Sequence, residues 1–350
     1  MLSQEDVVYA YRLLLGREPE SEDVVDMHAR KASSLGGLRE TMMSSTEFQT
    51  KLGRAQNQNR QQFIKPLDWD KCEVEVEGAP KELSKMIAHV QTVWENYGRT
   101  EPHWSVLTGD KFKANVISEN CDEFYASGQS AIRNLSATAA RYGIDLGQYK
   151  SCLELGCGVG RLTVWLAQQF EKVVAADISA PHLELAREAA ARFNRGNVSF
   201  VGLSSMNSLK EVERFDVFFS LITLQHNPPP IIAAMLSEIL NKLNDGGIAY
   251  FQVPTYKRGY SFRINDYINN FDNFDKMEMH VFPQDELFRL VERCNCVLLE
   301  VREDGYTGID SGVSNTILVR RRETVGKQKM SSADASRGTS ACGQVPHGLL

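Results

Sequence analysis

Between residues 150 and 321 the chain alternates short apolar runs with longer helical patterns, and this alternation constrains its fold more than any other feature. The apolar runs are rich in β-branched and aromatic residues, which is typical of buried strands. The seven predicted strands span 152–156, 172–178, 197–203, 215–224, 247–253, 297–303 and 315–321. Helical patterns separate most of them, at 162–170, 181–193, 231–243 and 285–294. Repeated strand–helix units predict an α/β domain with a mainly parallel sheet, covered by helices on both faces.

Changes of pattern along the chain predict its division into parts. We expect a helical module (1–53), a linker (54–79), a helical cap (80–149), the α/β domain (150–322) and a disordered tail (323–350). The linker prediction depends on the polar stretch 54–62, RAQNQNRQQ. The cap prediction depends on two amphipathic helical patterns, at 80–97 and at about 119–142. The tail is small, polar and low in complexity, as disordered segments are.

Composition argues against several classes of function. Lys and Arg number 39 against 45 Asp and Glu, a formal net charge of −6, which gives no general drive toward nucleic acids. No apolar run approaches the roughly 20 residues of a membrane span, and the charged start of the chain is unlike a signal peptide. The seven cysteines lack paired CxxC spacing, so we expect reduced thiols, no metal site and a cytoplasmic protein.

A glycine-rich segment, LELGCGVGR at 153–161, joins the first predicted strand to the helix that follows. Glycines in such a turn let the backbone bend sharply and approach a ligand, and the next helix presents unpaired N–H groups. Asp177 ends the second strand, 21 residues after Gly156, where an acidic side chain can accept hydrogen bonds from a ribose diol. The pattern predicts a nucleotide-cofactor site, although a tight turn without a ligand is the simpler alternative.

Two cofactor classes use this geometry. A dinucleotide site has the spacing GxGxxG, but Arg161 stands here where the third glycine of that pattern belongs. Glu154, two residues before the first glycine, would repel a pyrophosphate and can face a cation instead. S-adenosylmethionine is cationic, contains a ribose and has no phosphate. A nucleotide-dependent oxidoreductase remains the alternative, although no hydride-transfer site is visible.

Four motifs in order give this region a resemblance to class I S-adenosylmethionine-dependent methyltransferases. LELGCGVGR resembles the family's first motif and VVAADIS its second, while FDVFFSLITLQHNPPP and LNDGGIAYFQVP resemble the fourth-strand and fifth-strand motifs. The resemblance covers residues 150–321, about half of the chain. It implies a Rossmann-like, seven-stranded, mainly parallel sheet and S-adenosylmethionine as cofactor.

The same resemblance implies roles for individual residues. The implied cofactor-binding residues are Glu154, Gly156, Gly158, Gly160, Asp177, Ile178, Ser205, Met206, Ser220, Leu221 and Gln225, with Tyr125 and Gly128 as lid residues of the cap. Asp177 would hold the ribose and Glu154 the ammonium group. Many family members carry Asp where this chain has Leu203-Ser204-Ser205, which leaves the contact to the adenine amino group open.

The first 50 residues resemble a second family. YRLLLGREPESEDV followed by SSTEF is similar to a small helical module found beside glycan-processing enzymes in bacteria. The resemblance implies a role in bacterial polysaccharide biosynthesis or glycolipid chemistry. It also makes the module a candidate for binding a partner protein or for self-association.

A hydroxyl acceptor would need a base, because a sugar hydroxyl is a poor nucleophile at neutral pH. Histidine is the most suitable type, and its ordinary pKa near 6.5 predicts a rate that rises through about pH 6 to 7. His226 follows the fourth strand and is the first candidate, and His280 is the second. Tyr256 is the candidate positioning group. Each has a simpler alternative, as a core or capping histidine, a loop histidine and a surface aromatic.

The sequence therefore predicts a methyltransferase, most specifically one that O-methylates a glycan or cell-envelope-related acceptor. Other acceptors stay open, namely a small molecule, a lipid or a protein. A non-catalytic scaffold that binds S-adenosylmethionine is the alternative from another functional class. Fold resemblance alone does not decide between them.

Overall fold

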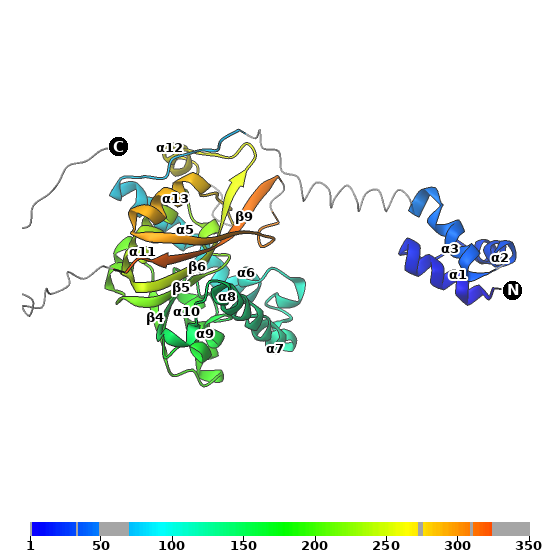
Figure 1. Ribbon diagram of the computed structural model, residues 1–350, viewed down its shortest axis with the longest axis horizontal. Coiled ribbons are helices and arrows are strands. Elements are labelled where there is room, and N and C mark those ends of the chain that lie inside the picture. Colours follow the sequence, from blue (N-terminus) through cyan, green and yellow to red (C-terminus); the bar gives the residue numbers. More distant parts are fainter. Residues whose placement is uncertain (1, 33, 49–69, 272–275, 309–310, 324–350) are drawn as a thin grey trace, which may run out of the picture. The chain divides into compact units, whose positions relative to one another are not determined.

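The computed structural model describes residues 2–32, 34–48, 70–271, 276–308 and 311–323 (Figure 1). Two compact units make up the chain, Met1–Trp69 and Asp70–Leu350. The stretch predicted as a polar linker at 54–62 and the tail from 324 onward lie outside the described residues.

The N-terminal unit is helical in its described part. Its helices are α1 (Gln4–Ala10), the π-helical turn η1 (Tyr11–Leu15), α2 (Glu22–Lys31) and α3 (Leu35–Met43). Ser3, Ser21 and Ser34 begin the α-helices, and each side-chain oxygen accepts a backbone N–H three residues further on. The small core consists of Val7, Tyr11, Leu15, Val25, Leu38 and Met42.

A seven-stranded sheet in the order β4-β3-β2-β5-β6-β9-β8 organises the second unit. Its strands are β2 (Ser151–Leu155), β3 (Lys172–Asp177), β4 (Val198–Gly202), β5 (Phe215–Ser220), β6 (Leu243–Lys257), β8 (Cys296–Asp304) and β9 (Gly312–Arg321). The first five strands along the chain pair in parallel, and β9 is antiparallel to both of its neighbours. The predicted Rossmann-like, mainly parallel α/β fold is confirmed.

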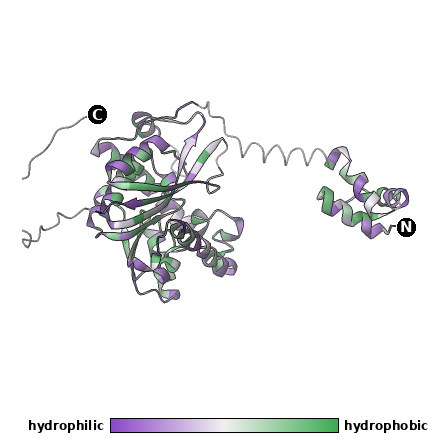
Figure 2. Cartoon of the chain, in the orientation of Figure 1, coloured by the Kyte–Doolittle hydropathy of each residue, from purple (hydrophilic) through white to green (hydrophobic). Residues whose placement is uncertain are grey.

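Helices cover both faces of this sheet, so its central strands are buried on both sides. Val217 and Phe219 pack on one face with α8 (Gln129–Arg141) and α9 (Thr163–Gln169). Phe218 points to the other face, where α5 (Pro80–Thr100), α11 (Pro229–Lys242) and α13 (Gln284–Arg293) pack. Figure 2 shows hydrophobic segments along these central strands. Burial on both sides explains why the strands are continuous apolar runs instead of alternating patterns.

The helix predicted at about 119–142 is two helices, α7 (Ile117–Ser127) and α8, which meet at Gly128. The indole Nε1 of Trp165 donates to the carbonyl oxygen of Tyr125 at 2.7 Å. In an uninterrupted α-helix this oxygen would accept the backbone N–H four residues later, so the contact with Trp165 interrupts the helical hydrogen bonds. A Cβ atom at Gly128 would lie 2.4 Å from the carbonyl oxygen of Arg161. The break therefore lets the cap approach the loop after β2 closely.

The predicted end of the linker, at residue 79, is wrong. Residues 70–79 belong to the second unit, because the short strand β1 (Glu73–Val74) pairs in parallel with β7 (Ser261–Phe262). Cys72 is buried, and Glu75 accepts a hydrogen bond from the backbone N–H of Ile264 at 2.7 Å. The sequence concealed this pairing because a two-residue strand has no periodicity to detect.

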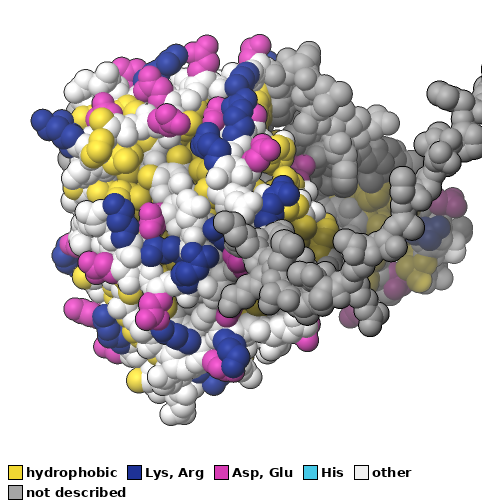
Figure 3. Space-filling view, turned by 60° about the vertical axis from the view of Figure 1, so that its left-hand side comes forward, with side chains coloured by type: hydrophobic (Ala, Val, Ile, Leu, Met, Phe, Trp, Pro, Cys, Tyr) yellow, Lys and Arg dark blue, Asp and Glu magenta, His cyan; other side chains and the backbone are white. Residues whose placement is uncertain are grey.

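Charges of both signs are mixed on the face shown in Figure 3, with no extended area of one sign. Ion pairs such as Arg263 with Glu73 and Arg289 with Asp285 join opposite charges on the second unit. Within the described ranges, no helix is both long and apolar enough to cross a membrane.

Two shortened chains test where the second unit begins. A chain that starts at Asp70 keeps the β1–β7 pair and should fold alone, with the thermal stability of the second unit in the full chain. A chain that starts at Pro80 loses the pair and the Glu75 bond, and should be less stable by about 1–3 kcal/mol. Denaturant unfolding measures both. Equal stability of the two chains would show that residues 70–79 are a linker after all.

Candidate functional site

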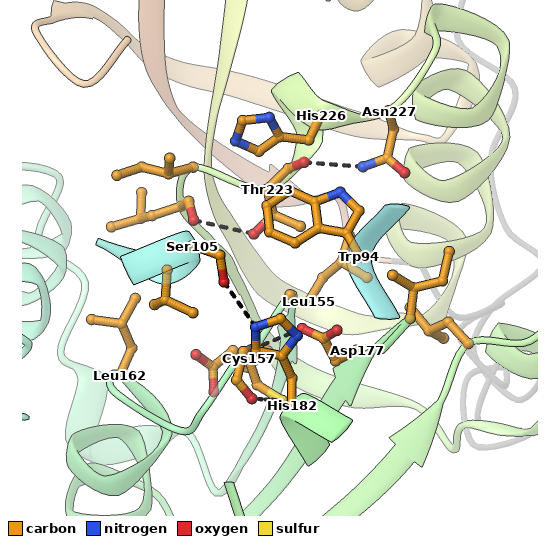
Figure 4. Close-up of a pocket in the computed structure, with 18 of the residues that line it drawn as sticks. Trp94, Ser105, Leu155, Cys157, Leu162, Asp177, His182, Thr223, His226 and Asn227 are labelled. Atoms are coloured by element: carbon orange, nitrogen blue, oxygen red, sulfur yellow. Dashed lines mark hydrogen bonds between the residues drawn. The ribbon is translucent and has the colours of Figure 1, made fainter. Parts of the chain in front are cut away.

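A pocket lies at the carboxyl ends of β2, β3 and β5 and is covered by α5 and by α6 (Pro102–Val106) (Figure 4). Its wall is formed by Val90, Trp94, Ser105, Val106, Glu154, Leu155, Gly156, Cys157, Gly158, Arg161, Leu162, Asp177, Ile178, His182, Leu203, Leu221, Ile222, Thr223, His226, Asn227 and Met235. Strand order reverses at β2, between β3 and β5. Ligands of open α/β sheets bind at such a switch point.

The loop after β2 has left-handed backbone at three glycines, with φ of +75° at Gly156, +51° at Gly158 and +84° at Gly160. A Cβ atom at Gly156 would lie 2.1 Å from the Thr223 side chain, and one at Gly158 would lie 2.4 Å from Val106. Gly156 and Gly158 line the pocket as predicted. Gly160 does not line it and instead packs against α10 (Ala180–Arg192).

Asp177 lies on the pocket wall at the end of β3 and is 7% exposed. One carboxylate oxygen accepts the backbone N–H of Gly158 at 2.8 Å, and the other accepts that of Ser179 at 2.9 Å. A carboxylate has about four lone-pair sites, so both oxygens can still accept bonds from a ligand. The side chain thus fixes the glycine loop and the start of α10 while it faces the pocket.

Glu154 is a buried carboxyl group on the same wall, 2% exposed. Its Oε2 accepts a hydrogen bond from Thr163 Oγ1 at 2.6 Å. Burial raises the pKa of Glu154 to about 7, against the opposing effects of the Thr163 bond and the Arg161 charge. A cation that entered the pocket would favour its ionised form.

His226 is held by a chain of hydrogen bonds that fixes its tautomer. The backbone N–H of Ile222 donates to Gln252 Oε1 at 3.0 Å, so the other end of this amide, Nε2, must face Gln225 Oε1, 3.1 Å away. Gln225 therefore turns its own Nε2 toward His226 Nε2, at 3.2 Å. The carbonyl oxygen of Glu278 accepts from His226 Nδ1 at 2.8 Å.

Both contacts require the same protonation state of the imidazole. A carbonyl oxygen can only accept, so Nδ1 carries the proton, and the Gln225 amide donates to the lone pair of Nε2. Burial lowers the pKa of His226 to about 4. The ring is therefore neutral at physiological pH, and the predicted rise in rate through pH 6 to 7 does not come from this residue.

Aromatic rings form the side of the pocket that faces the cap. The Trp94 indole lies between two imidazoles, with centroid distances of 5.1 Å to His226 and 6.3 Å to His182 (Figure 4). His182 Nε2 is 2.9 Å from Ser105 Oγ, and burial lowers its pKa. This side of the pocket is therefore aromatic and uncharged.

The structure brings seven predicted residues to the pocket wall, namely Glu154, Gly156, Gly158, Asp177, Ile178, Leu221 and His226. Ser220 and Gln225 lie just behind it. Ser220 Oγ donates to the Leu155 carbonyl, and Gln225 binds His226. Ser205 and Met206 do not line it, because the chain turns there into the short helix η4 (Met206–Glu211) and Met206 packs into the core.

Two groups of predicted residues lie away from the wall. Tyr125 donates through its hydroxyl to the carbonyl of Val159, and with Gly128 it supports the glycine loop from behind instead of covering the pocket. Tyr256 is on β6 and donates to the carbonyl of Asp70, and His280 Nδ1 lies 3.0 Å from the Tyr260 hydroxyl. Strand β1 pairs with β7 of the 254–279 insertion, but the end of this insertion returns to His226. The Glu278 carbonyl accepts from His226 Nδ1, and the His280 N–H donates to the Gln225 carbonyl at 2.7 Å.

Sequence reasoning missed the residues that other elements bring to the pocket, chiefly Trp94, Ser105, His182, Thr223 and Asn227. Trp94 belongs to the apolar stripe of α5, and such a stripe predicts packing against the core and gives no sign of a ligand site. His182 had a detectable signal, because it lies in the first turn of the helix after Asp177 and so faces the same edge of the sheet. Within the described ranges, no group of three or more His, Cys, Asp and Glu side chains is placed to hold a metal ion.

The tautomer of His226 can be measured directly by nitrogen NMR of the imidazole. We expect a proton on Nδ1 and none on Nε2 between pH 5 and 8. Gln252→Leu frees Gln225 to turn its oxygen toward the ring, so the Nε2–H form should become populated, at a cost in stability of about 1–3 kcal/mol. Ser314→Ala is the matched control, since it removes only the other partner of Gln252 Nε2. A wild-type ring protonated on Nε2 would contradict the assignment.

Comparison with known proteins shows what this part of the chain is similar to. The family model described as a methyltransferase domain matches residues 152–247. A tRNA/tmRNA (uracil-C(5))-methyltransferase from Campylobacter lari is 30% identical over 121 residues, which cover 32% of this chain and 35% of that protein. A carboxy-S-adenosyl-L-methionine synthase from Trichlorobacter lovleyi is 31% identical over 121 residues, 33% of this chain and 48% of that protein. The chain thus spans less than half the length of these curated relatives.

Among solved structures, magnesium protoporphyrin IX methyltransferase from Synechocystis PCC 6803 aligns with a TM-score of 0.46 at 18% identity, over 66% of this chain and 99% of that chain. The family model covers the glycine loop, Asp177 and His226, and the observed sheet surrounds them with five parallel strands and an antiparallel β9. Residues 152–247 therefore match a methyltransferase domain, and they lie in a mainly parallel, Rossmann-like sheet.

Proposed function

We propose that the chain transfers a methyl group from S-adenosylmethionine to a hydroxyl of a glycan or cell-envelope-related acceptor. One observation carries the proposal. A single pocket combines a glycine loop, a buried acid at Glu154, a hydrogen-bonded acid at Asp177 and a neutral imidazole at His226. The glycine loop lets a ligand approach the backbone closely, and Glu154 can face an ammonium group. Asp177 can accept hydrogen bonds from a ribose diol, and His226 can accept the proton of a hydroxyl.

The residues present fit this cofactor. Asp177 has lone pairs left for the ribose hydroxyls. Glu154 is a buried acid, and no cationic side chain among the described residues forms an ion pair with it within 4 Å. Ile178 and Leu203 give the adenine an apolar wall near the end of β3. When bound, the cofactor supplies a methyl group that its sulfonium has already activated. The protein then needs mainly to align the acceptor, which can contribute roughly 7–11 kcal/mol.

His226 is the group best placed to take the acceptor proton. Its Nε2 lone pair accepts the 3.2 Å bond from Gln225, which is long for a hydrogen bond, and an acceptor hydroxyl would replace that bond. Because Nδ1–H is anchored on the Glu278 carbonyl, the ring stays oriented during the exchange. The aromatic neighbour Trp94 gives a sugar an apolar face to stack on.

The acceptor class is supported by the N-terminal unit, which resembles modules beside glycan-processing enzymes. The curated relatives give no common acceptor, since one is named for uracil in tRNA and another for making carboxy-S-adenosylmethionine. Exposed apolar side chains on the unit, Tyr9 and Leu13 among them, offer contacts for a partner protein or a second copy.

Methyl transfer from labelled S-adenosylmethionine into fractionated bacterial glycans, lipids and proteins tests the proposal. We expect label in the glycan fraction, and none with Asp177→Ala at the same cofactor concentration. Label confined to lipids or proteins would overturn the glycan acceptor while keeping the methyltransferase. Cofactor binding without label in any fraction would favour a non-catalytic scaffold.

His226→Ala should lower kcat by roughly 100-fold or more, because a positioned base contributes about that much, while cofactor affinity stays close to wild type. With saturating cofactor, the wild-type kcat should be flat from about pH 5 to 8, since the pKa of His226 is lowered to about 4. His280→Ala serves for comparison and should have a smaller effect. Near-normal rates for both variants would favour an acceptor that is already anionic.

Cofactor binding should depend on pH through Glu154. The pKa of Glu154 is about 7 in the ligand-free protein, so at pH 6 most molecules carry a protonated Glu154. An ammonium binds to the ionised carboxylate, so cofactor binding at pH 6 releases this proton. Affinity should rise about tenfold between pH 5.5 and 7, where the cofactor's own amine stays protonated. Calorimetry in buffers of different ionisation enthalpy measures the proton. Glu154→Gln should bind more weakly and without this pH dependence. A wild-type curve that is flat would show that Glu154 does not meet the ammonium.

A further inference from the structure

The Glu278 carboxylate is the centre of a cluster of polar side chains outside the pocket wall. Its Oε2 accepts the hydroxyl of Tyr267, in the short helix α12 (Ile264–Ile268), at 2.5 Å. The Nε2 atoms of His280 and His89 lie 3.5 and 3.7 Å from the same oxygen. Burial alone would raise the pKa of Glu278, but these three neighbours together hold that pKa well below its usual range. The carboxylate is therefore ionised at neutral pH.

Ring packing holds the groups around this carboxylate in place. The His89 imidazole, which comes from α5, stacks on the Phe271 ring at a centroid distance of 4.3 Å. The Tyr267 ring meets the imidazoles of His89 and His280 edge to face, at 5.7 and 5.6 Å. Burial and the bond to Glu278 raise the pKa of Tyr267, so its hydroxyl keeps the proton that it donates. Moving the carboxylate would break contacts to α5, to α12 and to its own segment at once.

The backbone of the same residue binds the proposed base. Residues 277–283 are described in full and form neither helix nor strand, so side chains and single hydrogen bonds must fix their position. The Glu278 carbonyl accepts from His226 Nδ1 at 2.8 Å, and the His280 N–H donates to the Gln225 carbonyl at 2.7 Å. The segment thus contacts the turn after β5 through its backbone and the Glu278 cluster through its side chains.

These contacts form a closed path that begins and ends on α5. Trp94 of α5 lies beside the His226 ring, 5.1 Å between centroids, and His89 of the same helix faces the Glu278 carboxylate (Figure 4). We propose that the Glu278 carboxylate is a positioning group for His226, because it fixes the backbone carbonyl to which the Nδ1 proton is bound. The inference rests on the proposed function, in which His226 is the base.

The effect of this positioning group is confined to the acceptor side of the pocket. A ring that turns away from the Glu278 carbonyl no longer directs its Nε2 lone pair at a fixed point, so proton transfer slows. Asp177 and Glu154 belong to β3 and β2 and make none of their hydrogen bonds to this segment. Loss of the carboxylate contacts should therefore lower kcat while the affinity for S-adenosylmethionine stays unchanged.

Two tyrosines of the cluster give a matched pair of variants. Tyr267→Phe removes the hydroxyl that donates to Glu278, whereas Tyr260→Phe removes the hydroxyl that lies 3.0 Å from His280 Nδ1. In nitrogen NMR of the ligand-free protein, the His226 Nδ1 proton should exchange with water roughly tenfold faster in Tyr267→Phe. The exchange rate in Tyr260→Phe should equal that of wild type. With saturating cofactor, kcat should fall roughly tenfold in Tyr267→Phe alone.

Glu278→Gln tests the carboxylate itself, because it keeps the shape of the side chain and removes the charge. It should speed exchange at His226 as Tyr267→Phe does, with calorimetry giving wild-type affinity for S-adenosylmethionine. The double variant should be no worse than the more affected single variant, since both changes remove the same interaction. Additive effects would show two independent structural losses and would overturn the positioning role.

The remaining outcomes separate this inference from the proposed function. Wild-type exchange and kcat in both Tyr267→Phe and Glu278→Gln would refute the positioning role, and so would an equal loss in Tyr260→Phe. Faster exchange at His226 in a protein that methylates no acceptor would support the positioning role and refute the proposed function. Thermal unfolding checks that each variant is folded. If Tyr267→Phe does not fold, Glu278→Gln alone decides by the same two measurements.

Discussion

Crowding around the loop after β2 is the constraint on which the rest of the site depends. Three left-handed glycines let this loop pass close to Thr223, Val106 and α10. An added Cβ would collide with Thr223 at Gly156 and with Val106 at Gly158, and at Gly160 it would press against α10. Asp177 then fastens the loop by accepting the Gly158 N–H, and its second oxygen accepts the Ser179 N–H at the start of α10. Because the loop, a strand end and a helix start are joined through one carboxylate, the residues that face the pocket are held at fixed distances.

The sequence predicted the features that depend on neighbouring residues and missed those that depend on tertiary contacts. The strands followed from apolar runs, and Glu154 and Asp177 reached the pocket because parallel strands end at one edge of the sheet. Trp94 and Ser105 come from α5 and α6, whose docking on that edge is a tertiary contact with no periodicity of its own. Tyr256 and His280 were misplaced for the same reason, since tertiary hydrogen bonds turn their side chains toward Asp70 and Tyr260.

Two buried groups in the pocket give the folded state opposite dependences on pH. The pKa of Glu154 is raised from 4.5 to about 7, so the native state binds more protons and its stability falls as pH rises through that window. The pKa of His226 is lowered from 6.5 to about 4, so the unfolded state binds more protons there and stability rises with pH. The windows overlap between pH 4.5 and 6.5, and the two contributions oppose each other. The free energy of unfolding therefore changes less in this pH range than either group alone would cause, so a pH dependence of ligand affinity measured there is less affected by unfolding.

Ile222 has a left-handed backbone, with φ of +56°, which is rare for a β-branched residue and costs about 1–3 kcal/mol. Its N–H is the first donor in the chain of bonds that ends at His226. The oxygen and nitrogen ends of a glutamine amide are nearly equal in shape. Two glutamines and one imidazole joined in series by hydrogen bonds could therefore adopt several orientations of similar energy. A backbone amide cannot turn over as a side-chain amide can. The N–H of Ile222 can only donate, so it fixes which end of the Gln252 amide faces it. That choice then fixes the orientation of Gln225 and leaves one arrangement of the hydrogen-bond chain.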